Sequence, residues 1–257
     1  MFRLTGLLLT LLVLLARFAW LRVSKRRLTL ADRAAWLQSA CSLVLRRLSI
    51  SLTTEGPSPR TGLIISNHLS YLDIMLHAAA GPRIFVSKSE VRSWPLLGWL
   101  ARCGGTIFIV RGSRSGATEA AIGIEYALRS GITVVLFPEG TSTDGTTLRP
   151  FHSFLFEPAV EAESPITATA VSYEAEDTVE RNLCYYGDMG FISNLIDMAG
   201  HRSIHGRVRF DAKSRVYGNR RHAANDTWER VARLRLHADM DMPRHARHYS
   251  TLAGEAR

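Results

Sequence analysis

Apolar residues gather into short runs along most of the chain, and polar stretches separate these runs. From Gly62 onward, six runs have the length and composition of buried strands: GLIIS, RIFVS, TIFIV, ITVVLF, ITATAVSY and RVRFD. Between the first four of them lie three stretches with helical spacing, YLDIMLHAAA, WPLLGWLARCG and ATEAAIGIEYALRSG, the last closed by Gly131. Buried strands that alternate with helices predict an α/β fold with a mainly parallel sheet flanked by helices.

The N-terminal residues follow a different pattern, because an uncharged run extends from Leu4 to Ala16 before Arg17 interrupts it. As a helix this run spans roughly 20 Å, or roughly 27 Å if it continues to Leu21 with Arg17 snorkelling, against a hydrocarbon core of ~30 Å. A signal peptide is the competing interpretation, but only Arg3 precedes the run, no A-x-A site follows, and the RVSKRR cluster lies on the wrong side. We therefore expect a membrane-associated segment, either a short span or a helix lying at the interface. If it spans, the cluster should stay cytoplasmic.

Two further stretches complete the expected organisation. ADRAAWLQSACSLVLRRL predicts a second helix with a loose apolar face, and the turn-rich TTEGPSPRTG follows it. Near the end, AANDTWERVARLRLHA predicts another helix within a basic stretch. We divide the chain into N-terminal membrane-anchoring or interfacial helices (1–55), a main α/β domain (56–220) and a basic tail with a helix (221–257).

Charge adds to this picture through its distribution. The chain of 257 residues carries 32 basic and 23 acidic residues, for a net charge of +9. Before Gly62, Asp32 and Glu55 are the acidic residues set against Arg3, Arg17, Arg22, Lys25, Arg26, Arg27, Arg33, Arg46, Arg47 and Arg60. A basic end beside an apolar run favours an anionic membrane surface over nucleic acid, for which a recognisable binding module would be expected. Solubilising surface charge is the simpler alternative.

Several kinds of site find little support in the sequence. The three cysteines, Cys41, Cys103 and Cys184, are widely spaced, which argues against a disulfide framework or a zinc site and fits a reducing compartment. His201 and His205 have the spacing of a metal pair but lack the glutamate and helix of a metalloprotease, so no metal is expected. The chain also lacks a P-loop, a G-x-G-x-x-G fingerprint and a G-x-S-x-G elbow.

Polar residues follow three of the predicted strands at the same kind of position. His68 lies two residues beyond GLIIS, Arg111 follows TIFIV directly, and Pro138, Glu139 and Gly140 follow ITVVLF. In an open parallel sheet, ligands bind beyond the carboxyl ends of the strands. These residues are therefore expected to share one edge of the sheet.

His68 and Asp73 are five residues apart, which is not a spacing that pairs side chains on a helix. If His68 lies in the turn before a helix and Asp73 in its first turn, the carboxylate can hold one imidazole nitrogen as a donor. The other nitrogen is then an acceptor, which makes a general base. The alternative is a helix capped by Asn67, with Asp73 in the first turn and a histidine whose hydrogen bonds are satisfied within the fold. The spacing alone leaves both open.

The residues after the other two strands carry similar alternatives. Arg111 suits a phosphate or carboxylate that it would bind bidentately, or it lies in a surface turn formed by RGSRSG. Glu139, placed at a strand end, suits the orientation of Arg111, a backbone amide or a substrate hydroxyl. Gly140 permits close backbone approach, and Thr141 suits a cap or a ligand contact. An ordinary strand-turn is the alternative for this segment.

Taken together, NHLSYLD, GGTIFIVRG, FPEGTSTDG and ITATAVSY resemble, in order and spacing, the four blocks of the bacterial 1-acyl-glycerol-3-phosphate acyltransferase family. The resemblance runs from about Gly62 to Tyr173 and implies that 56–220 is an acyltransferase domain. It implies that His68 deprotonates the free hydroxyl of a lysolipid and that Asp73 orients His68. The acyl group would pass directly from acyl-CoA or acyl-carrier protein, with no acyl-enzyme and no cofactor.

The same resemblance implies roles for the substrate and its surroundings. Arg111 would hold an anionic head group, and Glu139, Gly140 and Thr141 would complete the substrate-binding site. The product would be phosphatidic acid, formed at the sn-2 hydroxyl of 1-acyl-glycerol-3-phosphate. The partners would be membrane lipids, the lysophospholipid acceptor and the acyl donor, without nucleic acid, at the cytoplasmic face of the inner membrane.

One position departs from the family pattern. Many members carry arginine after the FPEGT threonine, as a candidate phosphate ligand, whereas this chain has Ser142 followed by Thr143 and Asp144. This form, with YYGDM downstream, also resembles relatives that acylate lyso-ornithine lipid, which is the alternative acceptor. Two other classes remain: a catalytically silent membrane-binding module, which would be expected to lose His68, Asp73 or Glu139, and a metal-dependent hydrolase, which chelators would inhibit.

Overall fold

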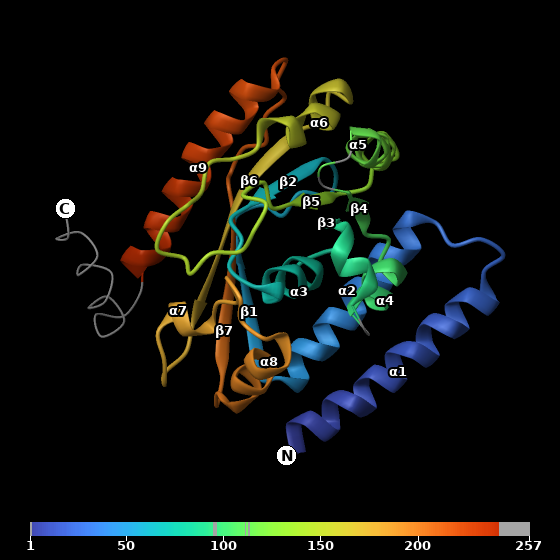
Figure 1. The fold of residues 1–257 in the computed structure, drawn as a ribbon, viewed down its shortest axis with the longest axis vertical. Coiled ribbons are helices and arrows are strands. Elements are labelled where there is room, and N and C mark those ends of the chain that lie inside the picture. The colour runs from blue at the N-terminus through green and yellow to red at the C-terminus, as the bar shows by residue number, and fades with distance from the viewer. Residues whose placement is uncertain (1, 95–96, 111, 113, 242–257) are drawn as a thin grey trace.

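A mixed β-sheet forms the centre of the protein in the computed structural model, which describes residues 2–94, 97–110, 112 and 114–241 (Figure 1). Within these residues the sheet has seven strands in the order β1-β7-β6-β2-β5-β3-β4. The strands are β1 (Ile50–Glu55), β2 (Leu63–Ser66), β3 (Ile84–Lys88), β4 (Ile107–Ile109), β5 (Val134–Leu136), β6 (Ile166–Glu174) and β7 (Ile204–Phe210).

Most strand pairs are parallel. β2 pairs in parallel with β5 and β6, and β3 pairs in parallel with β4 and β5. β7 runs antiparallel to β6 and parallel to β1, so these two strands point the opposite way from the other five. The prediction of an α/β fold with a mainly parallel sheet is therefore confirmed. β1 was not predicted, and the domain boundary expected at residue 55 falls at its end.

Helices cover both faces of the sheet. One face carries α1 (Phe2–Ser24), α2 (Leu30–Arg47), α3 (Tyr71–Ala79), α4 (Leu97–Cys103) and α8 (Phe191–Gly200). The other face carries α5 (Arg114–Arg129), α6 (Glu157–Glu161) and α9 (Arg220–Asp241). α7 (Glu180–Leu183) follows β6, and short 3-10 turns form at Ser89–Ser93 and Ser153–Phe156. Figure 1 shows α9 and α3 on opposite sides of β6 and β7.

The central strands are buried on both faces, which explains their uninterrupted apolar sequences. Alternate side chains of a strand point to opposite faces. Ile64 and Val135 accordingly belong to the core beneath α2 and α3, whereas Leu63, Ile65 and Val134 belong to the core beneath α5 and α9. Parallel strands covered on both sides need apolar residues at every position.

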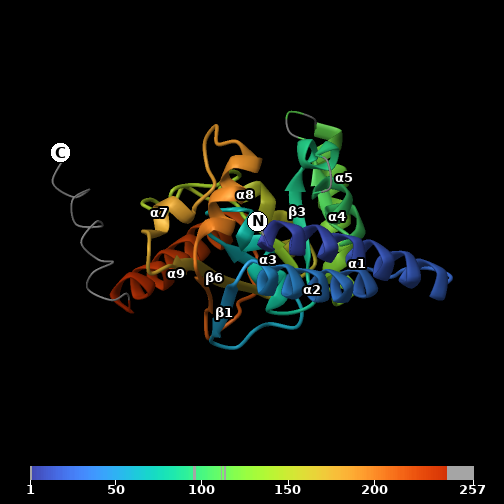
Figure 2. The same ribbon diagram turned by 90° about the horizontal axis from the view of Figure 1, so that it is seen from below.

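The first two helices pack against each other at the edge of this structure. α2 lies between α1 and α3 in Figure 1, and Figure 2 shows α1 and α2 side by side. Leu14 and Phe18 are the buried residues of α1 in the core beneath α2 and α3. Phe18 also contacts Trp36 of α2 edge to face, with ring centroids 4.9 Å apart. Among the described residues, no helix combines the length and the apolar character required to cross a bilayer.

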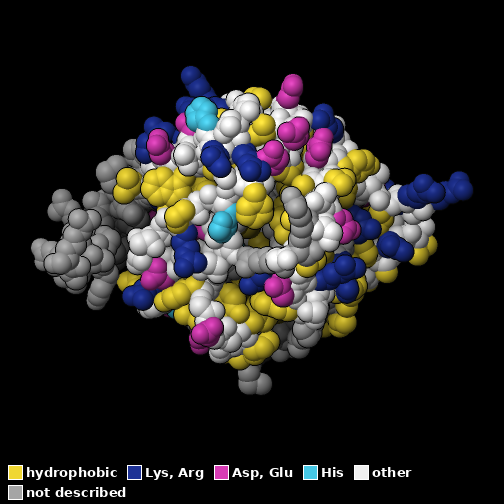
Figure 3. Space-filling view, turned by 45° about the horizontal axis from the view of Figure 1, so that its top comes forward, with side chains coloured by type: hydrophobic (Ala, Val, Ile, Leu, Met, Phe, Trp, Pro, Cys, Tyr) yellow, Lys and Arg dark blue, Asp and Glu magenta, His cyan; other side chains and the backbone are white. Residues whose placement is uncertain are grey.

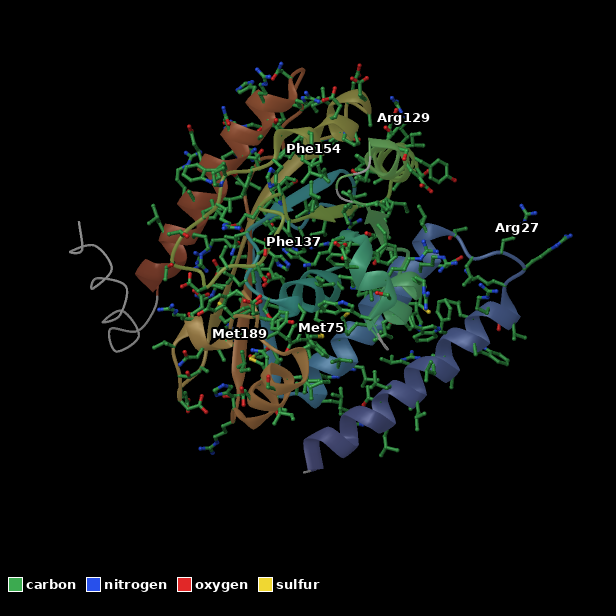
Figure 4. All side chains as sticks on the ribbon, in the orientation of Figure 1. Arg27, Met75, Arg129, Phe137, Phe154 and Met189 are labelled. Atoms are coloured by element: carbon green, nitrogen blue, oxygen red, sulfur yellow. The ribbon has the colours of Figure 1, made fainter. Side chains whose placement is uncertain are left out.

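The opposite side of α1 faces outward and is apolar. Leu12 is 61% exposed and Trp20 is 73% exposed, and Leu9, Val13 and Val23 share this outer surface. Basic side chains project from the end of the molecule where α1 turns into α2 (Figure 3), and Arg27 is one of them (Figure 4). The N-terminal helix thus presents an apolar surface next to a cationic end.

Candidate active site

His68 and Glu139 lie beyond the carboxyl ends of β2 and β5, as the sheet rule predicts. β2 ends at Ser66 and β5 ends at Leu136, and these two strands are neighbours in the sheet. His68 follows the first strand, and Phe137, Pro138 and Glu139 follow the second. A backbone hydrogen bond from Thr143 N to His68 O, at 2.9 Å, joins the two loops. His68 and the segment that begins with Phe137 therefore share this edge of the sheet, as predicted.

Local capping brings Asp73 to this edge. Ser70 is the N-cap of α3, with φ −162° and ψ 168°, and Asp73 is its third helical residue. Ser70 and Asp73 form a capping box, in which Ser70 N donates to Asp73 Oδ2 at 3.0 Å. Leu69 N donates to the same oxygen at 2.6 Å. The chain thus turns tightly before α3, which overcomes the spacing of five residues.

The same carboxylate contacts the histidine. His68 Nδ1 lies 2.8 Å from Asp73 Oδ2, and the side chain of Asp73 is fully buried while that of His68 is 21% exposed. Because a carboxylate only accepts hydrogen bonds, Nδ1 carries the proton and Nε2 is left as an acceptor. This arrangement is that of a histidine prepared to remove a proton from a bound hydroxyl.

Asn67 does not cap α3, unlike the cap considered from the sequence. Its side-chain amide donates to Val171 O at 3.1 Å and accepts from Val171 N at 2.8 Å. The side-chain amide therefore extends the backbone hydrogen bonding between β2 and β6 by one more pair of bonds. Asn67 fixes the main chain immediately before His68 to the neighbouring strand.

An aromatic ring supports the histidine from one side. Phe137 stacks on the His68 ring, with centroids 4.3 Å apart and planes 18° apart, and Figure 4 shows Phe137 in the middle of the molecule beside α3. A second histidine, His77, contacts Phe137 edge to face at 6.0 Å but is completely buried. Burial, together with the nearby charges of Arg83 and His68, lowers the pKa of His77 well below its ordinary value. Of these two histidines, only His68 is accessible and held by a carboxylate.

Glu139 holds main chain from two segments. Its Oε1 accepts from His68 N at 2.8 Å, and its Oε2 accepts from Arg149 N at 2.9 Å. The side chain is buried, and burial raises the pKa of Glu139 above its ordinary value, although these two amides and His68 act in the opposite direction. Of the roles considered for Glu139, orientation of a backbone amide is the one with a visible contact. Its role in substrate binding stays a prediction.

The loop after Glu139 begins with residues that were predicted to bind substrate. Gly140 adopts φ +73°, a conformation that favours glycine, and lies half-buried with Thr141 and Ser142. Further along, Asp144 pairs with Arg181 of α7 at 3.2 Å. Arg111 lies outside the described residues, so its predicted role in head-group binding stays a prediction.

Tyr173 belongs to this site and was not predicted. It lies on β6, and its hydroxyl donates a hydrogen bond to Asp73 Oδ1. Its only signal in the sequence is a polar tip on an aromatic residue within a strand that is otherwise buried, and such a hydroxyl needs a partner.

A cavity of about 250 Å³ adjoins the site on the side of α9. Its lining includes Asn67 and Leu69, which flank His68, together with the loop from Thr143 to Leu148 and Trp228 of α9. No group of three or more His, Cys, Asp or Glu side chains that could hold a metal ion is found in the described part of the chain. His201 instead pairs with Asp177 at 3.0 Å, and His205 lies 2.8 Å from Ser51.

Comparison with known sequences adds to this geometry. The sequence pattern of the acyltransferase family matches residues 49–172. A lyso-ornithine lipid O-acyltransferase from Pseudomonas aeruginosa is 37% identical over 161 residues, which are 62% of this chain and 60% of that protein. A second one, from Rhodobacter capsulatus, is 36% identical over 163 residues, 60% of this chain and 58% of that protein. The alignments thus span about three fifths of the length of these two relatives.

Two further relatives connect the sequence and the fold. A 1-acyl-sn-glycerol-3-phosphate acyltransferase from Neisseria meningitidis is 33% identical over 170 residues, 65% of this chain and 67% of that protein. The crystal structure of the 1-acyl-sn-glycerophosphate acyltransferase PlsC from Thermotoga maritima has a similar fold, with a TM-score of 0.66 at 18% identity, over 94% of this chain and 100% of that one. The chain belongs to the acyltransferase family that includes these bacterial lysolipid acyltransferases.

Proposed function

We propose that this protein transfers a fatty acyl group from a thioester to the free hydroxyl of a lysolipid. The observation that carries the proposal is the contact of 2.8 Å between His68 Nδ1 and Asp73 Oδ2, with the histidine ring partly accessible. This pair supplies a base for an alcohol, which is the group that such an acceptor offers.

The proposed reaction is a single transfer. His68 Nε2 removes the proton of the acceptor hydroxyl while the oxygen attacks the thioester carbon. The tetrahedral intermediate then collapses, the carbon–sulfur bond breaks, and the thiol leaves with the proton that His68 returns. The acyl donor is acyl-CoA or acyl-carrier protein. The transfer balances without a metal, a cofactor or an acyl-enzyme.

Two acceptors fit this chemistry, and local charge favours one of them. The loop after Glu139 has the neutral Ser142 where many members have arginine, and the acidic Asp144 nearby is paired with Arg181. Such a loop offers a phosphate monoester little electrostatic stabilisation. An acceptor that carries both a carboxylate and an amine has less net negative charge and depends less on a cation there. The names of the two relatives at 37% and 36% identity point the same way. We therefore put lyso-ornithine lipid first, and 1-acyl-glycerol-3-phosphate second.

The N-terminal helices bring the site to the membrane in this proposal. The outer surface of α1, with Leu12 and Trp20, matches the apolar layer beneath lipid head groups, and Arg26 and Arg27 match anionic lipids. The acyl chains need not cross water, which matters at about 0.8 kcal/mol per buried CH₂ group. We propose an interfacial location at the cytoplasmic face of the inner membrane.

The test is thiol release from acyl-CoA and from acyl-carrier protein by the full-length, detergent-solubilised protein. Lyso-ornithine lipid and lysophosphatidic acid are offered in parallel, with the His68→Ala variant as the control. Release that depends on His68 and on the ornithine acceptor supports the first choice, and release only with lysophosphatidic acid supports the second. If neither acceptor produces release that depends on His68, the proposed function is wrong.

A further inference from the structure

We propose that Tyr173 is a positioning residue for catalysis, which holds the Asp73 carboxylate in the orientation that serves His68. This inference rests on the proposed function, because it concerns the rate of the reaction that His68 and Asp73 perform. Tyr173 lies 100 residues from Asp73 along the chain, and its hydroxyl donates to Asp73 Oδ1 inside the protein.

The hydrogen bonds of Asp73 divide between its two oxygens. Oδ2 accepts from His68 Nδ1, Leu69 N and Ser70 N, at 2.8, 2.6 and 3.0 Å. Among the described residues, Tyr173 is the donor seen at Oδ1. A fully buried carboxylate needs donors at both oxygens to stay charged and fixed. Tyr173 therefore controls the one oxygen that the α3 turn does not reach.

The position of the Tyr173 hydroxyl is itself fixed by the sheet. Alternate residues of β6 point to the face that carries α3, and Val171 and Tyr173 belong to the core on that face. Asn67 bonds both backbone groups of Val171, so the strand end and the His68 turn are tied together two residues before Tyr173. Glu180 Oε1 accepts from Tyr173 N at 2.8 Å and fixes the main chain there.

Tyr173 is suited to donate at any working pH. Burial raises the pKa of Tyr173 well above its ordinary value, and the charge of Asp73 raises it further. The hydroxyl thus keeps its proton and supports the ionised carboxylate. When His68 takes a proton from the acceptor, that carboxylate stabilises the imidazolium that forms. Without Tyr173, the carboxylate loses its donor at Oδ1 and is free to rotate.

The test is the isosteric change Tyr173→Phe, assayed with the acceptor on which the wild type is active. Loss of a hydrogen bond to a charged group predicts a fall in kcat between about tenfold and hundredfold, with little change in the KM of either substrate.

The matched control is Tyr217→Phe. Tyr217 also lies among buried residues and donates to an aspartate, Asp226, but it packs in the core on the opposite face of the sheet. Both variants should lower the melting temperature, while the fall in kcat at nearly constant KM should belong to Tyr173→Phe. A wild-type kcat in Tyr173→Phe, while His68→Ala is inactive, would overturn this inference and leave the proposed function intact.

A second measurement excludes a general structural cause. In an Asp73→Ala background, Tyr173→Phe should no longer lower kcat, because the oxygen that it positions is gone. A further loss of tenfold or more in that background would show that Tyr173 acts by another route and would overturn the inference. A wild type that is inactive with every acceptor would instead reject the proposed function, independently of Tyr173.

Discussion

The carboxyl edge of the sheet buries a charged group, whereas the outer surface of α1 exposes apolar side chains. At the edge, the carboxylate of Asp73 is completely buried. On α1, large apolar side chains such as Leu12 and Trp20 face outward. Burying a charge and exposing apolar area each cost free energy, so neither is expected without a reason.

The two regions differ in how that cost is met. The cost at Asp73 is met within the chain, by donors from His68, Leu69, Ser70 and Tyr173. The exposed surface of α1 has no such partner in the described part of the chain, and in our proposal the lipid surface supplies it. The first region is therefore sensitive to substitution in any solution, and the second only when a membrane is present.

The largest effect is expected from a comparison of His68→Ala with Asp73→Asn. His68→Ala should lower kcat by ~10²–10⁴, the range for loss of a general base, with nearly wild-type stability. Asp73→Asn should also lower the free energy of unfolding by about 3 kcal/mol, because buried donors lose a charged acceptor. Kinetics and urea denaturation of both variants measure the two quantities.

A loss of stability in His68→Ala as large as the loss expected for Asp73→Asn would contradict this separation. So would an Asp73→Asn variant as stable as the wild type. Either result would mean that capping of α3 and orientation of His68 are not carried by the same carboxylate.

The second prediction concerns α1. Replacing Leu12 and Trp20 together by serine should weaken binding to anionic vesicles by at least roughly tenfold, because each buried large apolar side chain contributes about 1.5–3 kcal/mol. Activity on an acceptor dispersed in detergent should be unchanged. Flotation with vesicles that contain anionic lipid measures the binding.

The matched control for α1 is Ile122→Ser. Ile122 is 62% exposed, like Leu12, but lies on α5, which is remote from α1 in Figure 1. Equal loss of vesicle binding in Ile122→Ser would contradict a specific role of the α1 surface.

The smallest effect is expected from pH, through Glu139. Because burial raises the pKa of Glu139, its contribution to stability is fully present below the value in the unfolded chain and is lost as pH rises through the folded value. The stability of the wild type relative to Glu139→Gln should therefore decrease as pH rises from the ordinary pKa of 4.5 through the raised folded value. Urea denaturation of both proteins at a series of pH values measures the difference in the free energy of unfolding. If the wild type became more stable relative to Glu139→Gln as the pH rose, the result would be inconsistent with a raised pKa of Glu139.

β2, β5 and β6 were predicted because their apolar runs reflect burial on both faces. β4 was predicted because its residues are all apolar, although it is an edge strand and they are only half-buried. β1 was not predicted because it is an edge strand with the mostly polar sequence ISLTTE, in which only Ile50 is fully buried. α8 was not predicted because it begins after Gly190, which provides no side-chain cap to mark the start of a helix. Periodicity reports burial, so elements at the margin of the core leave a weak pattern.

The site divides in the same way. His68 and Asp73 were predictable because they are close in sequence and their positions follow from the end of β2. Tyr173 and the contacts of Glu139 with His68 N and Arg149 N were not, because they depend on which strands are neighbours in the sheet and on where each loop passes. Sequence order contains this information only indirectly.

The double role of Asp73 has a consequence for how such chains diverge. Asp73 both caps α3 and contacts His68, whereas the described contacts of His68 through its side chain are with Asp73 and Phe137. A descendant released from selection for catalysis would lose the histidine first, because replacing it leaves the helix start intact. The aspartate would persist for as long as the fold itself is maintained. In distant homologues, the histidine is therefore the better marker of retained activity, and an aspartate found alone indicates only inherited architecture.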